Sequence, residues 1–160
     1  LFSAIAMLKN SYVVWEGASL IDGSPIVLIL TGFVNHTSNR KTGYLLQSWI
    51  IKQNILPTEA AKKGFDKAIC GDCPMKLSRL GSCYVNLAVT NNIYRKYETG
   101  AYPYFSKNEI EVLKRYRYPI RIGSYGDPTA VPFDVWKPII LASGSHTGYT
   151  HLCNTKKIII

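Results

Sequence analysis

Short apolar runs bounded by turn-forming residues recur along the chain and predict strands. The clearest run covers residues 25–31 and lies between Ser24 and Gly32. It is continuous rather than alternating and too short for an ordinary helix, so we expect a strand buried on both faces. Weaker forms of this pattern predict strands at residues 13–15, 44–51, 119–123 and 146–153.

Helix signals occupy several of the intervals between these strands. Ser106 and Glu109 form a capping box, which predicts a helix beginning at Ser106. We expect Pro138 to stand in the first turn of a helix or to break it. Helices are also predicted at residues 57–64, 90–99 and, in part, 133–141.

The alternation of strands and helices predicts an α/β fold. We expect one domain over residues 1–160, with a partial-barrel-like or open, largely parallel sheet flanked by helices. Residues 1–12 are expected to form a poorly ordered or cloning-derived N-terminal segment. Functional groups of such folds gather in loops beyond the carboxyl ends of the strands, so these loops are the places to search.

Composition narrows the class of protein. The chain has 160 residues, of which 47% are hydrophobic and 18% charged, which suits one compact core. The longest apolar run, residues 26–30, is far too short to span a membrane, so we expect no membrane association. A formal net charge of +9 favours anionic partners, with nucleic acid first.

Three of the four cysteines lie close together in the sequence and predict a metal loop. Cys70 and Cys73 form a C-x2-C motif, and Cys83 follows nine residues later. Thiolates select zinc, copper(I) or iron–sulfur clusters. The spacing therefore predicts a shared inorganic centre on these three residues, and the low cysteine content points to the cytoplasm.

The identity of the centre stays open at this point. A zinc site would need a fourth ligand, which Cys153, His146 or His151 could supply if it folds back. An iron–sulfur cluster with one open iron fits the three cysteines equally well. Alternatively, Cys70 and Cys73 are a redox-active pair and Cys83 is simply buried.

Asp127 and His151 are the candidate catalytic residues. Asp127 follows a glycine at the end of a predicted strand, where its carboxylate could bind a cation, orient a histidine or contact a ligand hydroxyl. The alternative is an aspartate that caps its own turn. His151 could act as acid, base or ligand, because imidazole changes charge near neutral pH, or it could be structural.

A segment rich in tyrosines and cations predicts a surface for nucleic acid. Residues 94–118 interleave rings suited to base stacking with charges suited to phosphates. Helical spacing also allows several of these rings to face the core while the cations are solvated. The candidate nucleic-acid contacts are Lys41, Arg95, Lys96, Arg115 and Arg117.

Five short motifs together resemble an uncharacterised phage-encoded family. They are Asn39-x-Lys41-Thr42-Gly43, Cys70-Gly71-x-Cys73-Pro74, Cys83-Tyr84-Val85-Asn86, Gly123-x-Tyr125-Gly126-Asp127-Pro128 and Tyr149-Thr150-His151. The resemblance spans roughly residues 14–152. More distantly, the motifs are similar to phage proteins related to the radical S-adenosylmethionine barrels.

The resemblance implies a viral metal-binding protein in the host cytoplasm. Cys70, Cys73 and Cys83 would hold an iron–sulfur cluster whose open iron could bind a small molecule. The usual radical-enzyme spacing is C-x3-C-x2-C, whereas this chain has C-x2-C-x9-C. The alternatives are a non-catalytic, zinc-stabilised nucleic-acid-binding protein and a thiol redox protein.

Overall fold

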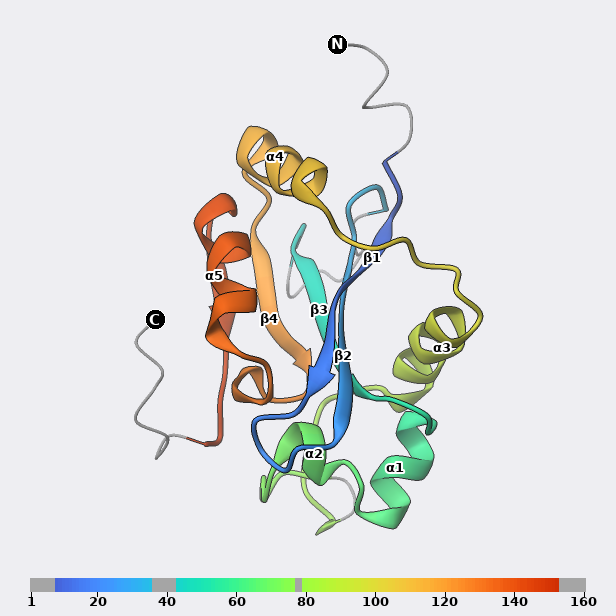
Figure 1. The fold of residues 1–160 in the computed structure, drawn as a ribbon. Coiled ribbons are helices and arrows are strands. Elements are labelled where there is room, and N and C mark those ends of the chain that lie inside the picture. The colour runs from blue at the N-terminus through green and yellow to red at the C-terminus, as the bar shows by residue number, and fades with distance from the viewer. Residues whose placement is uncertain (1–7, 36–42, 77–78, 153–160) are drawn as a thin grey trace.

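The computed structural model describes residues 8–35, 43–76 and 79–152 and contains a five-stranded mixed sheet (Figure 1). The strands are β1 (Ser11–Ala18), β2 (Pro25–Thr31), β3 (Leu46–Lys52), β4 (Ile120–Tyr125) and β5 (His146–Gly148). The helices are α1 (Pro57–Lys63), α2 (Lys67–Cys70), α3 (Leu87–Glu98), α4 (Lys107–Tyr116) and α5 (Phe133–Ala142). Ser11 and Tyr12, which fall in the predicted N-terminal segment 1–12, belong to β1.

The sheet has the order β1-β2-β3-β4-β5 and is open, neither closed nor curled. The predicted α/β class and the open sheet are confirmed, whereas the partial-barrel-like alternative is wrong. The prediction of a largely parallel sheet is also wrong, because β1, β2 and β3 pair antiparallel. The strands β3, β4 and β5 pair parallel.

Connection length explains the antiparallel half of the sheet. β1 and β2 are joined by residues 19–24, where the Ser19 and Ser24 backbones hydrogen-bond at 2.8 Å. A turn this short can only return the chain antiparallel, since a parallel neighbour needs a crossover of about a dozen residues. By contrast, α1, α2, α3 and α4 all lie in the connection between the parallel strands β3 and β4.

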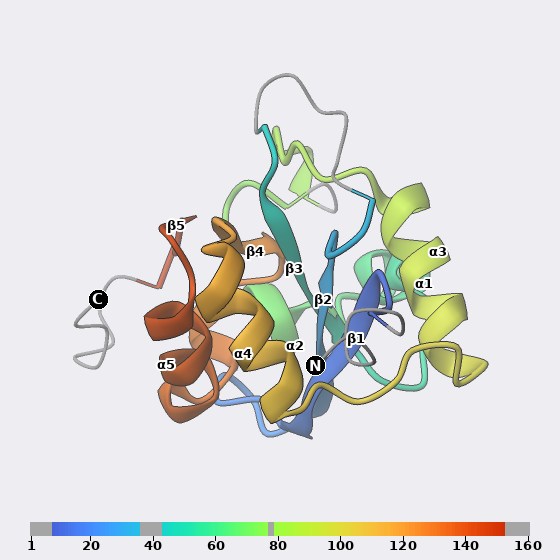
Figure 2. The ribbon, with the colours of Figure 1, turned by 90° about the horizontal axis from the view of Figure 1, so that it is seen from above.

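The core forms around β2, which is the most buried element. Residues 26–30 of this strand are all 0% exposed. The strand pairs with β1 on one edge and β3 on the other, so its backbone groups are satisfied within the sheet. Helices α4 and α5 pack together on one side of the molecule, at the left of Figure 2. Helices α1 and α3 pack together on the opposite side, at the right of the same view.

Most of the predicted elements form, with differences that have local causes. α4 has the predicted capping box. The predicted strand at 146–153 stops at Gly148 as β5, because Thr150 and the backbone of His151 bind the Asp127 carboxylate instead. α5 continues through Pro138, contrary to the prediction, and this residue is exposed, so water can reach the carbonyl that the proline leaves without a donor.

The carboxyl edge of the parallel strands holds α2 in place. The Asp127 backbone N–H, just beyond β4, donates to the Ile69 carbonyl at 2.6 Å. From the loop after β1, Ser19 Oγ donates to the Ala68 carbonyl at 2.6 Å. α2 therefore lies at the end of the sheet toward which β4 points, and it delivers Cys70 to that edge (Figure 1).

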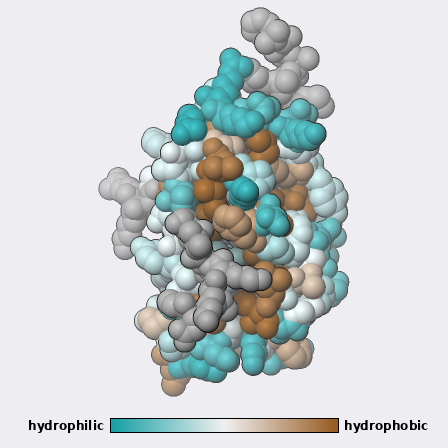
Figure 3. Space-filling view, turned by 60° about the vertical axis from the view of Figure 1, so that its left-hand side comes forward, coloured by the Kyte–Doolittle hydropathy of each residue, from teal (hydrophilic) through white to brown (hydrophobic). Residues whose placement is uncertain are grey.

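The surface mixes polar and apolar areas. The face that includes α5 shows hydrophobic patches among hydrophilic side chains (Figure 3). α5 itself exposes Phe133 and Leu141. Within the part of the chain that the structure describes, no helix is both long and apolar enough to cross a membrane.

Gly126 offers a test of how tightly the carboxyl edge is packed. Its φ is +82°, and a Cβ there would lie 2.7 Å from the Cβ of Ile50. Backbone strain and overpacking add, so Gly126→Ala should lower the free energy of unfolding by about 2–4 kcal/mol. Urea denaturation followed by tryptophan fluorescence measures the loss.

Gly23→Ala is the matched control for this prediction. Gly23 has a similar φ of +77°, but nothing lies within 4 Å of a Cβ at this position. Gly23→Ala should therefore lower the free energy of unfolding only by the cost of the left-handed backbone conformation, about 1 kcal/mol. Equal losses for the two variants would contradict the packing argument.

Candidate functional site

The cysteine loop, defined here as residues 70–76 and 79–83, folds back on itself through backbone hydrogen bonds. Cys70 ends α2, and Gly71 follows with φ 55° and ψ −140°, a conformation that glycine adopts without strain. The Cys73 N–H donates to the Cys70 carbonyl at 3.2 Å. The Cys83 N–H donates to the Met75 carbonyl at 2.9 Å, which returns the third cysteine to the first two.

The Cys70 thiol is influenced by the other two cysteines and by two nearby charges. All three are free cysteines, and each residue as a whole is partly exposed, although the sulfur of Cys70 is buried. Burial of the Cys70 sulfur is the main cause that raises the pKa of this thiol to about 12. Asp66 raises the same pKa further, Lys76 lowers it, and Cys73 and Cys83 raise it by smaller amounts. Cys73 and Cys83 thus lie near enough to Cys70 to act on its thiol.

Tyr125 extends this environment to the end of β4. The residue is 5% exposed, and burial raises the pKa of its phenol well above the ordinary value. Cys70, Asp66 and Cys83 raise that pKa further. Cys70 of α2, Asp66 and the last residue of β4 therefore lie near one another at the carboxyl edge of the sheet.

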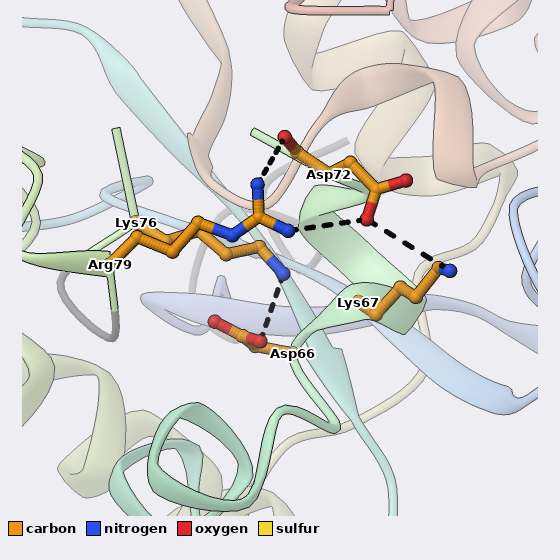
Figure 4. Close-up of polar contacts among 5 residues, drawn as sticks. All are labelled: Asp66, Lys67, Asp72, Lys76 and Arg79. Carbon is orange, nitrogen blue, oxygen red and sulfur yellow. Dashed lines mark hydrogen bonds and ion pairs between the residues drawn. The ribbon is translucent and has the colours of Figure 1, made fainter. Parts of the chain in front are cut away.

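Two sets of ion pairs fasten the loop to α2 (Figure 4). In the first, Lys76 Nζ lies 3.0 Å from Asp66 Oδ1, and the two side chains are only 8% and 7% exposed. In the second, Asp72 Oδ1 lies 3.6 Å from Arg79 and 3.9 Å from Lys67, and all three side chains are more than half exposed. Exposed pairs contribute little to stability, about 0–1 kcal/mol, whereas removal of one partner of the buried pair would leave the other charge uncompensated away from water.

The thiols do not form a ready-made metal site. Among the residues that the structure describes, no three His, Cys, Asp or Glu side chains are arranged to hold an ion. A metal would require the thiol side chains to turn toward a common centre. Of the predicted fourth ligands, His146 and His151 are exposed, and Cys153 lies outside the described residues.

Asp127 is engaged by its own turn and by the segment after β5. Its carboxylate accepts hydrogen bonds from the Thr129 N–H and hydroxyl at 3.0 and 2.7 Å. It also accepts one from the Thr150 hydroxyl at 2.8 Å and one from the His151 backbone N–H at 2.9 Å. The imidazole of exposed His151 is not the group that meets Asp127, so these contacts match the turn-capping alternative. A catalytic role for the two residues stays a prediction.

The predicted nucleic-acid contacts are divided between two helices. Arg95 and Lys96 are exposed on α3, whereas Arg115 is exposed on α4 and Arg117 is exposed at the C-cap of that helix. α3 and α4 lie apart in both ribbon views (Figures 1 and 2). Lys41 lies outside the described residues. The four described cations therefore do not form a single surface. Binding of nucleic acid stays a prediction.

The sequence reasoning missed several residues beside the cysteines. Asp66 and Lys76 flank the C-x2-C motif with opposite charges, and this arrangement was the available signal. Arg121 of β4 lies over the ring of Tyr84 at 4.8 Å and donates a hydrogen bond to its hydroxyl. Tyr84 follows Cys83 directly, but its pairing with Arg121 depends on tertiary structure that no spacing reveals.

A shallow groove of about 430 Å³ lies away from the cysteines, between β1, α4 and α5. Its walls are mainly apolar, with Lys107 and Asp134 as the charged members. Among the described residues that line it, none is a predicted site residue. The cysteine loop is therefore the stronger candidate for chemistry.

The comparisons with known proteins identify no relative. No protein-family model matches the chain, and no curated protein or solved structure matches it either. Function therefore has to be inferred from the geometry of the loop itself.

The raised pKa of Cys70 predicts slow alkylation in the metal-free native protein. A pKa of about 12 instead of the usual 9 leaves a thiolate population about a thousandfold smaller at pH 8. Iodoacetamide labelling mapped by mass spectrometry should show Cys70 reacting far more slowly in native than in urea-unfolded protein. Equal rates in the two states would contradict the burial of this sulfur.

The same shift predicts a loss of stability in alkali. The native-state pKa is raised, so this contribution is fully present below about pH 9 and is lost as pH rises toward about pH 12. Unfolding frees the thiol to ionise, which favours the unfolded state. Urea midpoints should fall over this range, and the fall should be smaller in Cys70→Ser.

The contacts of Asp127 predict a structural cost that His151 does not share. Asp127→Asn replaces one acceptor oxygen by an NH2 group that faces other donors, which should cost about 1.5–3 kcal/mol. His151→Ala removes an exposed side chain and should change stability by less than about 0.5 kcal/mol. Chemical denaturation of both variants tests the difference, and an Asp127→Asn variant as stable as the wild type would refute it.

Proposed function

We propose that this protein binds a metal centre through the thiolates of Cys70, Cys73 and Cys83, with an iron–sulfur cluster as the first candidate and zinc as the second. The observation that carries the proposal is the folded-back loop at the carboxyl edge of the parallel strands, in which Cys73 hydrogen-bonds back to Cys70, Cys83 hydrogen-bonds back to Met75, and all three cysteines are free. Loops at this edge commonly carry the ligand sites of α/β proteins.

The chemistry of the donors favours a soft metal. Thiolates prefer zinc, copper(I) and iron–sulfur clusters over the hard cations that carboxylates bind. Binding requires deprotonation, so the centre must displace a proton from each thiol, including the buried Cys70. Three local thiolates leave one coordination position for an outside ligand, which suits a cluster with one open iron.

The position of Cys70 weakens the case for a thiol redox protein. Redox-active C-x2-C pairs are activated where a helix N-terminus or a neighbouring cation lowers the thiol pKa. Here the motif begins at the last residue of α2, and burial raises the pKa of the Cys70 thiol to about 12. A metal ion supplies the positive charge that such a thiol needs to ionise.

Anaerobic reconstitution with ferrous iron and sulfide tests the proposal. We expect a brown protein with stoichiometric iron and sulfide and visible absorption. Cys70→Ser, Cys73→Ser and Cys83→Ser should each lose most of the bound iron, because each removes one of only three ligands. A colourless protein that retains zinc after purification would favour the second candidate.

Cys153→Ser is the matched control. It removes a thiol remote in sequence, and a three-cysteine cluster should keep its full iron content. Zinc lost from this variant would instead indicate a four-thiolate site. Full metal occupancy in Cys83→Ser would refute the proposed ligand set.

A further inference from the structure

A row of polar residues crosses all five strands of the sheet at one level. The strand registers place opposite one another, in this order, Ser11 of β1, Thr31 of β2, Gln47 of β3, Arg121 of β4 and Thr147 of β5. Residues directly opposite each other in a sheet point to the same face, so these side chains are neighbours on one face. Two residues further along the first three strands, the opposed residues are Val13, Ile29 and Trp49. The face therefore changes from apolar to polar at this level.

The polar row is closed at its centre and open toward β5. Gln47 is only 6% exposed, and its side chain has partners within the protein. Its amide N–H donates to the Leu45 carbonyl at 3.2 Å, and its Oε1 accepts from the Ser124 hydroxyl at 2.6 Å. Thr147 is exposed, and Arg121 is partly exposed. The part of the row on β4 and β5 is therefore the part that a ligand can reach (Figure 2).

Tyr84 fixes the position of the Arg121 guanidinium. The guanidinium carbon lies over the tyrosine ring, 4.8 Å from its centroid, and an Nη atom donates a hydrogen bond to the phenol oxygen. Because that oxygen is the acceptor, the phenol O–H proton is available for another partner. The guanidinium also keeps N–H donors that this contact does not use. A donor group fixed before its ligand arrives loses less conformational entropy on binding.

The charge of Arg121 has no carboxylate partner in the described part of the chain. The ion pairs formed there join Lys67, Lys76, Arg79 and Lys114 to acidic side chains, and Arg121 is not among them. A cation that is partly shielded from water interacts more strongly with an anion than a fully solvated cation does. Arg121 is therefore a suitable anchor for an external anion.

We propose that Arg121, Tyr84 and Thr147 bind an oxyanion group, a phosphate or a carboxylate, of a small ligand. Guanidinium N–H groups match two oxygens of such a group. The hydroxyls of Tyr84 and Thr147 supply further donors, one from the loop and one from the neighbouring strand β5. The site uses no thiol and requires no metal, so it goes beyond the proposed function and stands independently of it.

The surroundings favour a small ligand over nucleic acid. Nucleic-acid binding depends on a series of cations that neutralise successive phosphates. The four described cations predicted for that role lie on α3 and α4 and form no single surface with one another. A single guanidinium with two hydroxyls suits one anionic group instead.

The experiment is a titration of the isotope-labelled full chain with inorganic phosphate, and separately with acetate, at pH 7.5 and constant ionic strength. Amide ¹H–¹⁵N correlation spectra report where each anion binds. We expect saturable shifts at Tyr84, Arg121 and Thr147 with at least one of the two anions. Saturation by phosphate alone assigns a phosphate ligand, and saturation by acetate alone assigns a carboxylate ligand.

Three variants test the roles of the side chains. Arg121→Gln removes the charge and the matched donors, so the affinity should fall about tenfold or more. Arg121→Lys keeps the charge but loses the planar donor arrangement, so the affinity should fall about threefold to tenfold. Tyr84→Phe keeps the ring and loses the hydroxyl, which should weaken binding about threefold.

Arg115→Gln is the matched control. Arg115 also lies over a tyrosine ring, 5.6 Å from the centroid of Tyr116, but it is exposed on α4 and is not part of the polar row. This variant loses the same net charge as Arg121→Gln and should bind the anion as the wild type does. Equal losses of affinity in the two variants would show that only the net charge matters and would overturn the site.

Two further results would also overturn the proposal. One is the absence of saturable shifts at Tyr84, Arg121 and Thr147 with both anions. The other is a single-stranded oligonucleotide that binds far more tightly than phosphate and shifts the amides of α3 and α4 as well, because it would replace the small ligand by nucleic acid. If Arg121→Gln does not fold by circular dichroism, Arg121→Lys and Tyr84→Phe carry the test, and unchanged affinity in both refutes the assignment.

Discussion

The complete burial of β2 is the constraint on which the rest of the fold depends. A strand with residues 26–30 inaccessible to water needs partners on both edges and cover on both faces. The two edges of β2 pair with β1 and β3. The short connection between β1 and β2 brings the first of these partners alongside. The helices then pack against the sheet, and the connection through α2 leaves the cysteine loop at the carboxyl edge of the parallel strands.

Much of the local structure could be predicted because its signals are local. The apolar run of β2 and the capping box of Ser106 and Glu109 each determine an element from a few neighbouring residues. The strand pairing could not be obtained in this way. Three strands were expected before the first helix, and that order already argued for antiparallel pairing at the N-terminal part of the sheet. The alternation of strands and helices in the later part of the chain led instead to the prediction of a largely parallel sheet.

The site shows the same division between local and distant signals. The motif of Cys70 and Cys73 is visible in the sequence, and so is the turn at Asp127. The burial of Lys76 against Asp66 is not, because lysine is usually exposed and only the folded loop shields it. Likewise, the hydrogen bonds that the Asp127 carboxylate accepts come partly from residues more than twenty positions away. A catalytic carboxylate and a structural one look alike until those donors are placed.

The placement of the cysteine loop within the connection from β3 to β4 has a consequence for how the protein is made. β1, β2 and β3 follow one another and can pair through contacts that are close in sequence, which favours early assembly. Pairing of β4 with β3 closes a far longer loop, so it loses more conformational entropy of the chain. Until this pairing forms, the thiols lack the shelter of Tyr125 and the turn at Asp127. During that interval the three thiols are more accessible to oxidants than they are in the native fold, so the order in which the strands pair determines how long they stay unprotected.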